Sequence, residues 1–128
     1  MIEPAFGIDR IIWHILDHAY EEIEKQGENY TLMKLNPDVV PIDYAVLPLF
    51  EKDGMGEMAR EVNRMLNSKF GVVSSLDSSG SIGRRYARAD EIGIPVCVTV
   101  DYQSLEDQTV TIRTRDTGEQ IRVKLSEL

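Results

Sequence analysis

The chain has 128 residues, a length that suits one compact domain with a single hydrophobic core. Its composition, 42% apolar and 28% charged, is ordinary for a soluble protein, and it has neither an apolar run that could span a bilayer nor a basic leader at its start. The single cysteine, Cys97, excludes a disulfide framework within the chain, and we expect a reducing, cytoplasmic location and a buried thiol.

The net charge of −8 argues against a general nucleic-acid-binding protein, because such proteins are normally basic. The distribution of charge is uneven, however. Acidic residues dominate the first sixty positions, and basic ones gather later, at Arg84, Arg85, Arg88, Arg113, Arg115, Arg122 and Lys124. An acidic protein can still bind RNA through a local basic patch, so the sequence leaves that class open.

The first 41 residues predict a helix, a short strand and a junction. Apolar residues recur at spacings of three and four from Ile8 onward, which predicts a helix over 8–25 with Gly27 as its stop signal. A short strand is expected over 30–35. Two prolines then interrupt residues 36–41, which makes this stretch the candidate boundary between domains 1–35 and 36–128.

The remainder alternates between strand and helix periodicity. We expect helices over 54–69 and 82–92, and strands over 42–50, 72–76 and 95–101. A hairpin over 109–115 and 120–125 should turn at Asp116-Thr-Gly118. This order predicts an α/β fold, a mixed sheet of about five strands flanked by helices with right-handed crossovers.

One candidate site precedes the first helix. Arg10 lies in the first helical turn, where a guanidinium can grip a phosphate bidentately, and Glu3 could hold an ammonium group. The alternative is a solvated or ion-paired arginine.

A second candidate is the glycine-containing stretch that opens the helix over 82–92. Gly80 and Gly83 would let backbone N–H groups converge on a phosphate or a base edge. Arg84 and Arg88 are four residues apart and share a helix face, and Tyr86 could stack on a base. The alternative is a solvated basic helix.

Two weaker candidates remain. In the hairpin, Arg113 and Arg115 share a strand face, as do Arg122 and Lys124, but the register between the strands is not fixed and a solvated face is the default. His14 and His18 have the i, i+4 spacing of a zinc clamp, yet no glutamate follows His14 and no third ligand is evident, so no metal site is predicted.

These residues carry a family resemblance. Ile2-Glu-Pro-Ala-Phe-Gly-Ile-Asp-Arg-Ile11 resembles motif 3 of class II aminoacyl-tRNA synthetases in the form of archaeal and eukaryotic glycyl-tRNA synthetases. Asp77-Ser-Ser-Gly-Ser-Ile-Gly-Arg-Arg-Tyr-Ala-Arg-Ala-Asp-Glu-Ile-Gly93 is similar to the anticodon-domain signature of the same family. Val98-Thr-Val-Asp101 and Arg115-Asp-Thr-Gly-Glu-Gln-Ile-Arg122 continue the likeness, which runs in the right order over nearly the whole chain.

The resemblance implies roles for single positions. Arg10 matches the motif 3 arginine, a catalytic residue that binds the ATP triphosphate. Glu3, with Pro4 and Ala5, matches the glycine-binding stretch, although Ala5 stands where the family pattern has a serine. Arg84 matches an arginine of anticodon recognition. Its neighbours Gly80, Ser81, Gly83, Arg85 and Arg88 are added to the expected tRNA-binding set on physical grounds.

The implied parent activity is ATP- and Mg²⁺-dependent ligation of glycine to its tRNA, with this part mainly recognising the anticodon. Motifs 1 and 2, which carry the homodimer interface and most of the ATP site, have no counterpart in the chain. We therefore expect the isolated chain to lack catalytic competence and to bind no cofactor tightly. The alternatives are a stand-alone tRNA-binding or accessory module of the same fold, and a protein-interaction domain that has lost its RNA function.

Overall fold

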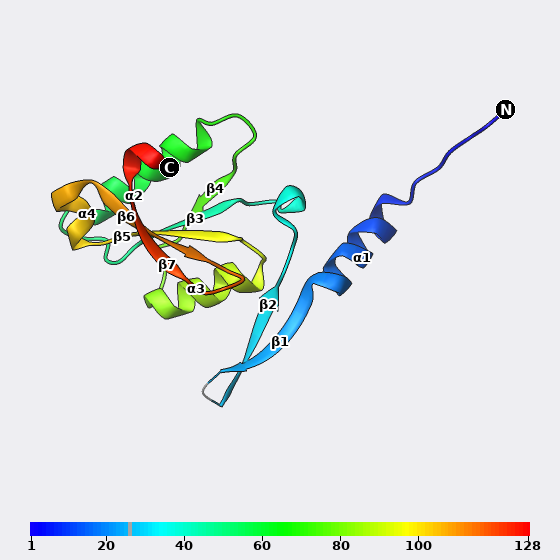
Figure 1. Ribbon diagram of the computed structural model, residues 1–128, viewed down its shortest axis with the longest axis horizontal. Coiled ribbons are helices and arrows are strands. Elements are labelled where there is room, and N and C mark those ends of the chain that lie inside the picture. The colour runs from blue at the N-terminus through cyan, green and yellow to red at the C-terminus, as the bar shows by residue number, and fades with distance from the viewer. Residues whose placement is uncertain (26) are drawn as a thin grey trace.

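The computed structural model describes residues 1–25 and 27–128 and contains two sheets (Figure 1). A two-stranded antiparallel sheet follows the first helix, and a five-stranded mixed sheet has the order β4-β3-β5-β6-β7. The helices are α1 (Ile8–Ala19), α2 (Met55–Asn67), α3 (Ile82–Glu91) and α4 (Tyr102–Asp107). The strands are β1 (Tyr20–Lys25), β2 (Glu28–Met33), β3 (Tyr44–Pro48), β4 (Ser74–Leu76), β5 (Val96–Val100), β6 (Thr109–Thr114) and β7 (Gln120–Lys124), and two short 3-10 turns lie at Pro37–Val39 and Leu125–Glu127.

The five-stranded sheet is covered on both faces, which confirms the predicted α/β architecture. β3 is parallel to β4 on one side and to β5 on the other, whereas β6 and β7 are antiparallel. The connection from β3 through α2 runs to β4 on one side of β3, and the connection from β4 through α3 runs in the opposite direction to β5. Because both crossovers are right-handed, α2 and α3 lie on opposite faces of the sheet, as Figure 1 shows. Each face has its own core: α2 packs over Val46 and Val98, and α3 packs over Ala45 and Cys97.

The region before the sheet differs from the prediction. The helix ends at Ala19, and residues 20–25 form strand β1. Glu and Lys favour a helix weakly, but Glu21 and Ile23 are half-buried while their neighbours are exposed, which is the period of a strand. Pairing with β2 supplies the backbone hydrogen bonds of β1, and this tertiary contact overrides the local preference.

Two smaller differences lie elsewhere. The structure adds helix α4, which the sequence reading missed although Asp101 and Ser104 form a capping box at its start. The strand expected over 72–76 is shorter, at Ser74–Leu76. In the part of the chain that the structure describes, no helix is long and apolar enough to cross a membrane.

Helix α1 projects away from the sheet, together with the residues before it (Figure 1). Its apolar side chains stay in solvent: Ile8 is 69% exposed and Trp13 is 68% exposed. β2, in contrast, packs against α3, where Leu32 and Leu35 are buried. The domain boundary at residue 36 stays a prediction. Residues 28–35, which it assigns to the first domain, pack against the second domain, residues 36–128.

Candidate nucleic-acid interface

The glycine-containing loop lies between β4 and α3, at the carboxyl end of β4. Gly80 has φ +76°, a left-handed conformation that glycine adopts without strain. Beyond it, Ser81 is the N-cap of α3 and makes no side-chain capping bond. The loop therefore leads into a helix N-terminus that carries partial positive charge.

Arg85 holds this loop from beneath. Its guanidinium donates to the carbonyl oxygen of Gly80 through Nε at 3.1 Å and Nη2 at 2.7 Å, and through Nη1 to the carbonyl oxygen of Pro48 at the end of β3. The residue is buried. Arg85 thus ties two loops together, and it offers no exposed guanidinium to an RNA.

Arg88 holds the other side of the loop. Its Nε and Nη2 donate to Asp77 Oδ2 at 3.0 and 2.7 Å, and Nη2 also donates to the carbonyl oxygen of Ser79. Burial alone would raise the pKa of Asp77, but the backbone N–H of Ser79 and the Arg88 guanidinium outweigh it and lower that pKa. Asp77 therefore stays ionised and keeps the loop in shape.

Arg84 differs from its two neighbours. It is exposed, and among residues 1–25 and 27–128 its side chain has no hydrogen-bond or ion-pair partner. The sequence placed Arg84, Arg85 and Arg88 together as RNA contacts. The structure brings them to one loop but leaves only Arg84 uncommitted, while Gly83 has open space above its Cα.

In the hairpin, the expected solvated face is wrong for Arg113 and Arg115, which are buried, whereas Arg122 and Lys124 lie at exposed positions. The register pairs Thr111 with Arg122 and Arg113 with Gln120, which puts both arginines on one face. Arg122 forms an ion pair with Asp101, whereas Arg113 is buried. The face therefore presents no uncommitted pair of arginines.

Arg113 belongs to a buried polar cluster. Its Nη1 and Nη2 donate to the two carboxylate oxygens of Asp90, each at 2.9 Å, and Tyr30 Oη donates to Asp90 Oδ2 at 2.7 Å. Burial and the hydrogen bond to Asp90 raise the pKa of Tyr30, so its hydroxyl remains a donor. This Asp90 cluster joins β2 to α3 and β6.

Arg115 makes a second connection between the same parts. It is buried, and it donates to the carbonyl oxygens of Gly93 at 2.9 Å and Leu35 at 2.7 Å. Gly93 has φ +86°, and a Cβ there would lie 2.7 Å from Leu35 Cδ1. No sequence spacing predicts these pairs, because each joins residues more than twenty positions apart.

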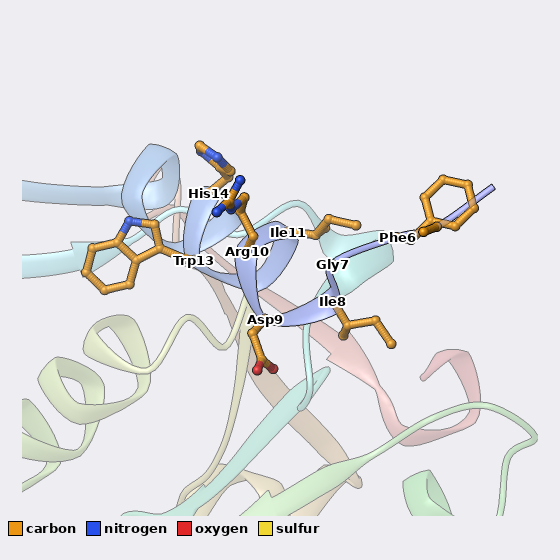
Figure 2. Close-up of a pocket in the computed structure, with 9 residues that line it drawn as sticks. Phe6, Gly7, Ile8, Asp9, Arg10, Ile11, Trp13 and His14 are labelled. Atoms are coloured by element: carbon orange, nitrogen blue, oxygen red, sulfur yellow. The ribbon is translucent and has the colours of Figure 1, made fainter. Parts of the chain in front are cut away.

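The candidate residues at the chain start lie on an open surface. Glu3, Pro4, Ala5 and Arg10 are all exposed. Figure 2 shows Arg10 and His14 extending to one side of α1 and Asp9 to the other, around a hollow lined by residues 5–11, Trp13 and His14. Among residues 1–25 and 27–128, none outside this segment lines the hollow, so Arg10 and Glu3 do not enclose a nucleotide or an amino acid by themselves.

Two further expectations concern Cys97 and metals. Cys97 is buried at 1% exposure, and burial raises the pKa of its thiol to about 12, which confirms it as a core residue. Within the described ranges, no group of three or more His, Cys, Asp or Glu residues is placed to hold a metal ion.

A pair of aromatic residues escaped the sequence analysis. Phe50, in the loop after β3, and Tyr102, the first residue of α4 after β5, have ring centroids 6.2 Å apart and are both about half exposed. The sequence feature that could have identified this pair is that each aromatic residue follows the end of a parallel strand, β3 or β5, by two positions.

The sheet has a glycine-containing loop at the carboxyl ends of its parallel strands, and Arg84 beside this loop has no partner among the described residues. Such an arrangement suits a domain that binds single-stranded RNA. The family model described as "Anticodon binding domain" matches residues 43–128, and the chain belongs to this family.

Among curated relatives, the chain is 51% identical over its whole length to the glycine–tRNA ligase of Methanocaldococcus jannaschii, covering 21% of that protein. It is 50% identical, again over its whole length, to the glycine–tRNA ligase of Archaeoglobus fulgidus, of which it covers 22%. Among solved structures, prolyl-tRNA synthetase from Cryptosporidium parvum, complexed with L-proline and AMP, superimposes with a TM-score of 0.67 at 25% identity, over 75% of this chain and 21% of that one. The chain thus spans about a fifth of the length of these relatives.

Proposed function

We propose that this chain is the part of a glycine–tRNA ligase that recognises the anticodon of tRNA, and that Arg84 makes the central contact. The observation that supports this is that Arg85 and Arg88 bind the loop, whereas Arg84 has no such contact. Arg85 and Arg88 spend their donors on the loop, so the loop is held in one shape before RNA arrives. Arg84 projects from the first turn of α3 with its donors free for a base edge or a phosphate.

Removal of Arg84 tests this assignment. In Arg84→Ala we expect the affinity for a glycine tRNA transcript to fall about tenfold at low salt, the size of one lost arginine contact. Arg64→Ala is the matched control, since Arg64 is exposed on α2 across the sheet and should leave affinity unchanged. An unchanged affinity in Arg84→Ala would refute the role of this residue.

The salt dependence then identifies what Arg84 touches. If it contacts a phosphate, the slope of log affinity against log salt should become shallower by about 0.7 in the variant. If it contacts a base edge, the slope should stay and discrimination between anticodon sequences should fall.

Ligation of glycine, with ATP and Mg²⁺ as co-substrate and cofactor, is proposed for the whole enzyme, which in these relatives is about five times longer than the chain. Here the chain would contribute Arg10 to bind the triphosphate and Glu3, with Pro4 and Ala5, to contact glycine. Because these residues stand exposed, we expect the 128-residue chain alone to show no glycine-dependent exchange of pyrophosphate into ATP. Exchange activity in the isolated chain would contradict this part of the proposal.

An accessory module that binds tRNA in trans is the competing function. It predicts the same loss in Arg84→Ala but no use for Arg10 in any assembly. In a full-length glycine–tRNA ligase carrying this segment, Arg10→Ala should therefore abolish adenylate formation under the present proposal and leave it intact under the alternative.

A further inference from the structure

β3 and β5 are neighbouring parallel strands whose carboxyl ends lie at one edge of the sheet. The chain leaves β3 through α2 to β4 on one side, and then returns through α3 to β5 on the other side. The connections after β3 and β5 start at the same edge of the sheet and lead into α2 and α4, which contact each other on one face (Figure 1). In open α/β sheets, ligands bind outside the carboxyl ends of the strands.

Phe50 and Tyr102 stand at this edge. Pro48 and Val100 are the last paired residues of β3 and β5, and Phe50 and Tyr102 each follow two positions later. Their rings are tilted by 46° with centroids 6.2 Å apart, and they are 46% and 48% exposed. Two large aromatic side chains therefore meet in solvent, although burial would stabilise the fold.

A lysine and two carboxylates lie around the rings. Lys52 Nζ lies 5.7 Å from the centroid of Phe50. The two nearby carboxylates are engaged, since Asp53 accepts the hydroxyl of Tyr102 at 3.1 Å and Glu51 pairs with Arg60 at 3.5 Å. Lys52 thus places a positive charge beside the exposed aromatic pair.

The aromatic pair and the Arg84 loop share one edge of the sheet. Arg85 donates both to Pro48, at the end of β3, and to Gly80, in the loop before Arg84. The two features are therefore connected through one buried side chain at the same edge of the sheet.

We propose that Phe50 and Tyr102, with Lys52 beside them, form a stacking site for an unpaired base of the bound RNA. This inference rests on the function proposed above and adds a second contact to it. Because every base has an aromatic face, stacking on this pair adds affinity with little sequence preference. Arg84 would supply the sequence specificity.

The test uses glycine tRNA transcripts with 2-aminopurine at single anticodon-loop positions, bound to the full chain. We expect Phe50→Leu and Tyr102→Leu to weaken binding about tenfold, with an unchanged salt slope because no charge is lost, and to abolish the fluorescence change at one position. Tyr102→Phe should retain both affinity and fluorescence. Phe70→Leu is the control, since Phe70 is fully exposed in the connection between α2 and β4, at the opposite edge of the sheet.

Each outcome bears on one of the two proposals. If both leucine variants bind within twofold of the wild type while Arg84→Ala is impaired, the stacking site is refuted and the anticodon function stands. If the wild type does not bind the transcript, both fail together. A free nucleotide, probed with cytidine monophosphate, should bind at least a hundredfold more weakly than the transcript; tight binding of it that depends on Tyr102 would assign the site to a mononucleotide and overturn the RNA proposal.

Discussion

Replacement of Arg113 by methionine should destabilise the fold strongly. The change removes both hydrogen bonds to Asp90, whose side chain is only 1% exposed, and leaves that carboxylate with the hydroxyl of Tyr30. An uncompensated buried charge costs about 3–5 kcal/mol. A domain of this size has a total stability of about 5–15 kcal/mol, so Arg113→Met should approach the limit of folding.

Urea unfolding followed by far-ultraviolet circular dichroism measures this cost. Arg122→Met is the matched control, because its ion pair with Asp101 is partly exposed and should be worth less than about 1 kcal/mol. The double variant Asp90→Leu/Arg113→Met removes both charges and should recover most of the loss. A cost in Arg113→Met no larger than that in Arg122→Met would refute the assignment of a buried, mutually dependent pair.

Two further predictions concern the loops. Gly93→Ala should lower the midpoint of thermal unfolding well beyond Gly118→Ala: both positions have positive φ, but only at Gly93 would the new Cβ meet Leu35 and the carbonyl oxygen of Met33, and equal losses would contradict this packing. The second prediction is that Asp77→Asn should destabilise the chain at neutral pH and not in acid. Because the folded pKa of Asp77 lies below its ordinary value, its stabilisation is complete above about pH 4 and disappears as the pH falls through the lowered folded value. Urea titrations from pH 7 to pH 2 check this, and a pH-independent difference between the two proteins would contradict it.

The alternation of strand and helix after residue 41 could be predicted from sequence because local rules and tertiary structure agree there. The apolar face of α2, with Met55, Met58, Ala59, Val62 and Leu66, packs on the sheet as its spacing indicates. The hairpin also forms where its turn residues predict it. Over residues 20–25 the local sequence pattern predicts a helix, but pairing with β2 makes this segment a strand.

The candidate site was predictable in position but not in the roles of its side chains. The spacing of Gly80, Arg84 and Arg88 locates the loop, yet an isolated sequence does not show that Arg85 points inward to Pro48 or that Arg88 meets Asp77. Burial of Arg113 and Arg115 was missed for the same reason, since their partners Asp90 and Leu35 are remote in the chain. In the candidate site, long-range pairing separates Arg85 and Arg88, which hold the fold, from Arg84, which has no such partner among the described residues.

Recognition of the anticodon is the central claim, and a comparison of two tRNAs tests it most directly. The full chain is titrated with a glycine tRNA transcript and with the same transcript carrying three replaced anticodon nucleotides. Because loss of each specific contact costs about 1–3 kcal/mol, the account predicts binding to the altered transcript at least tenfold weaker, and a much smaller difference between the two in Arg84→Ala. Equal affinity of the wild-type chain for both transcripts would contradict it.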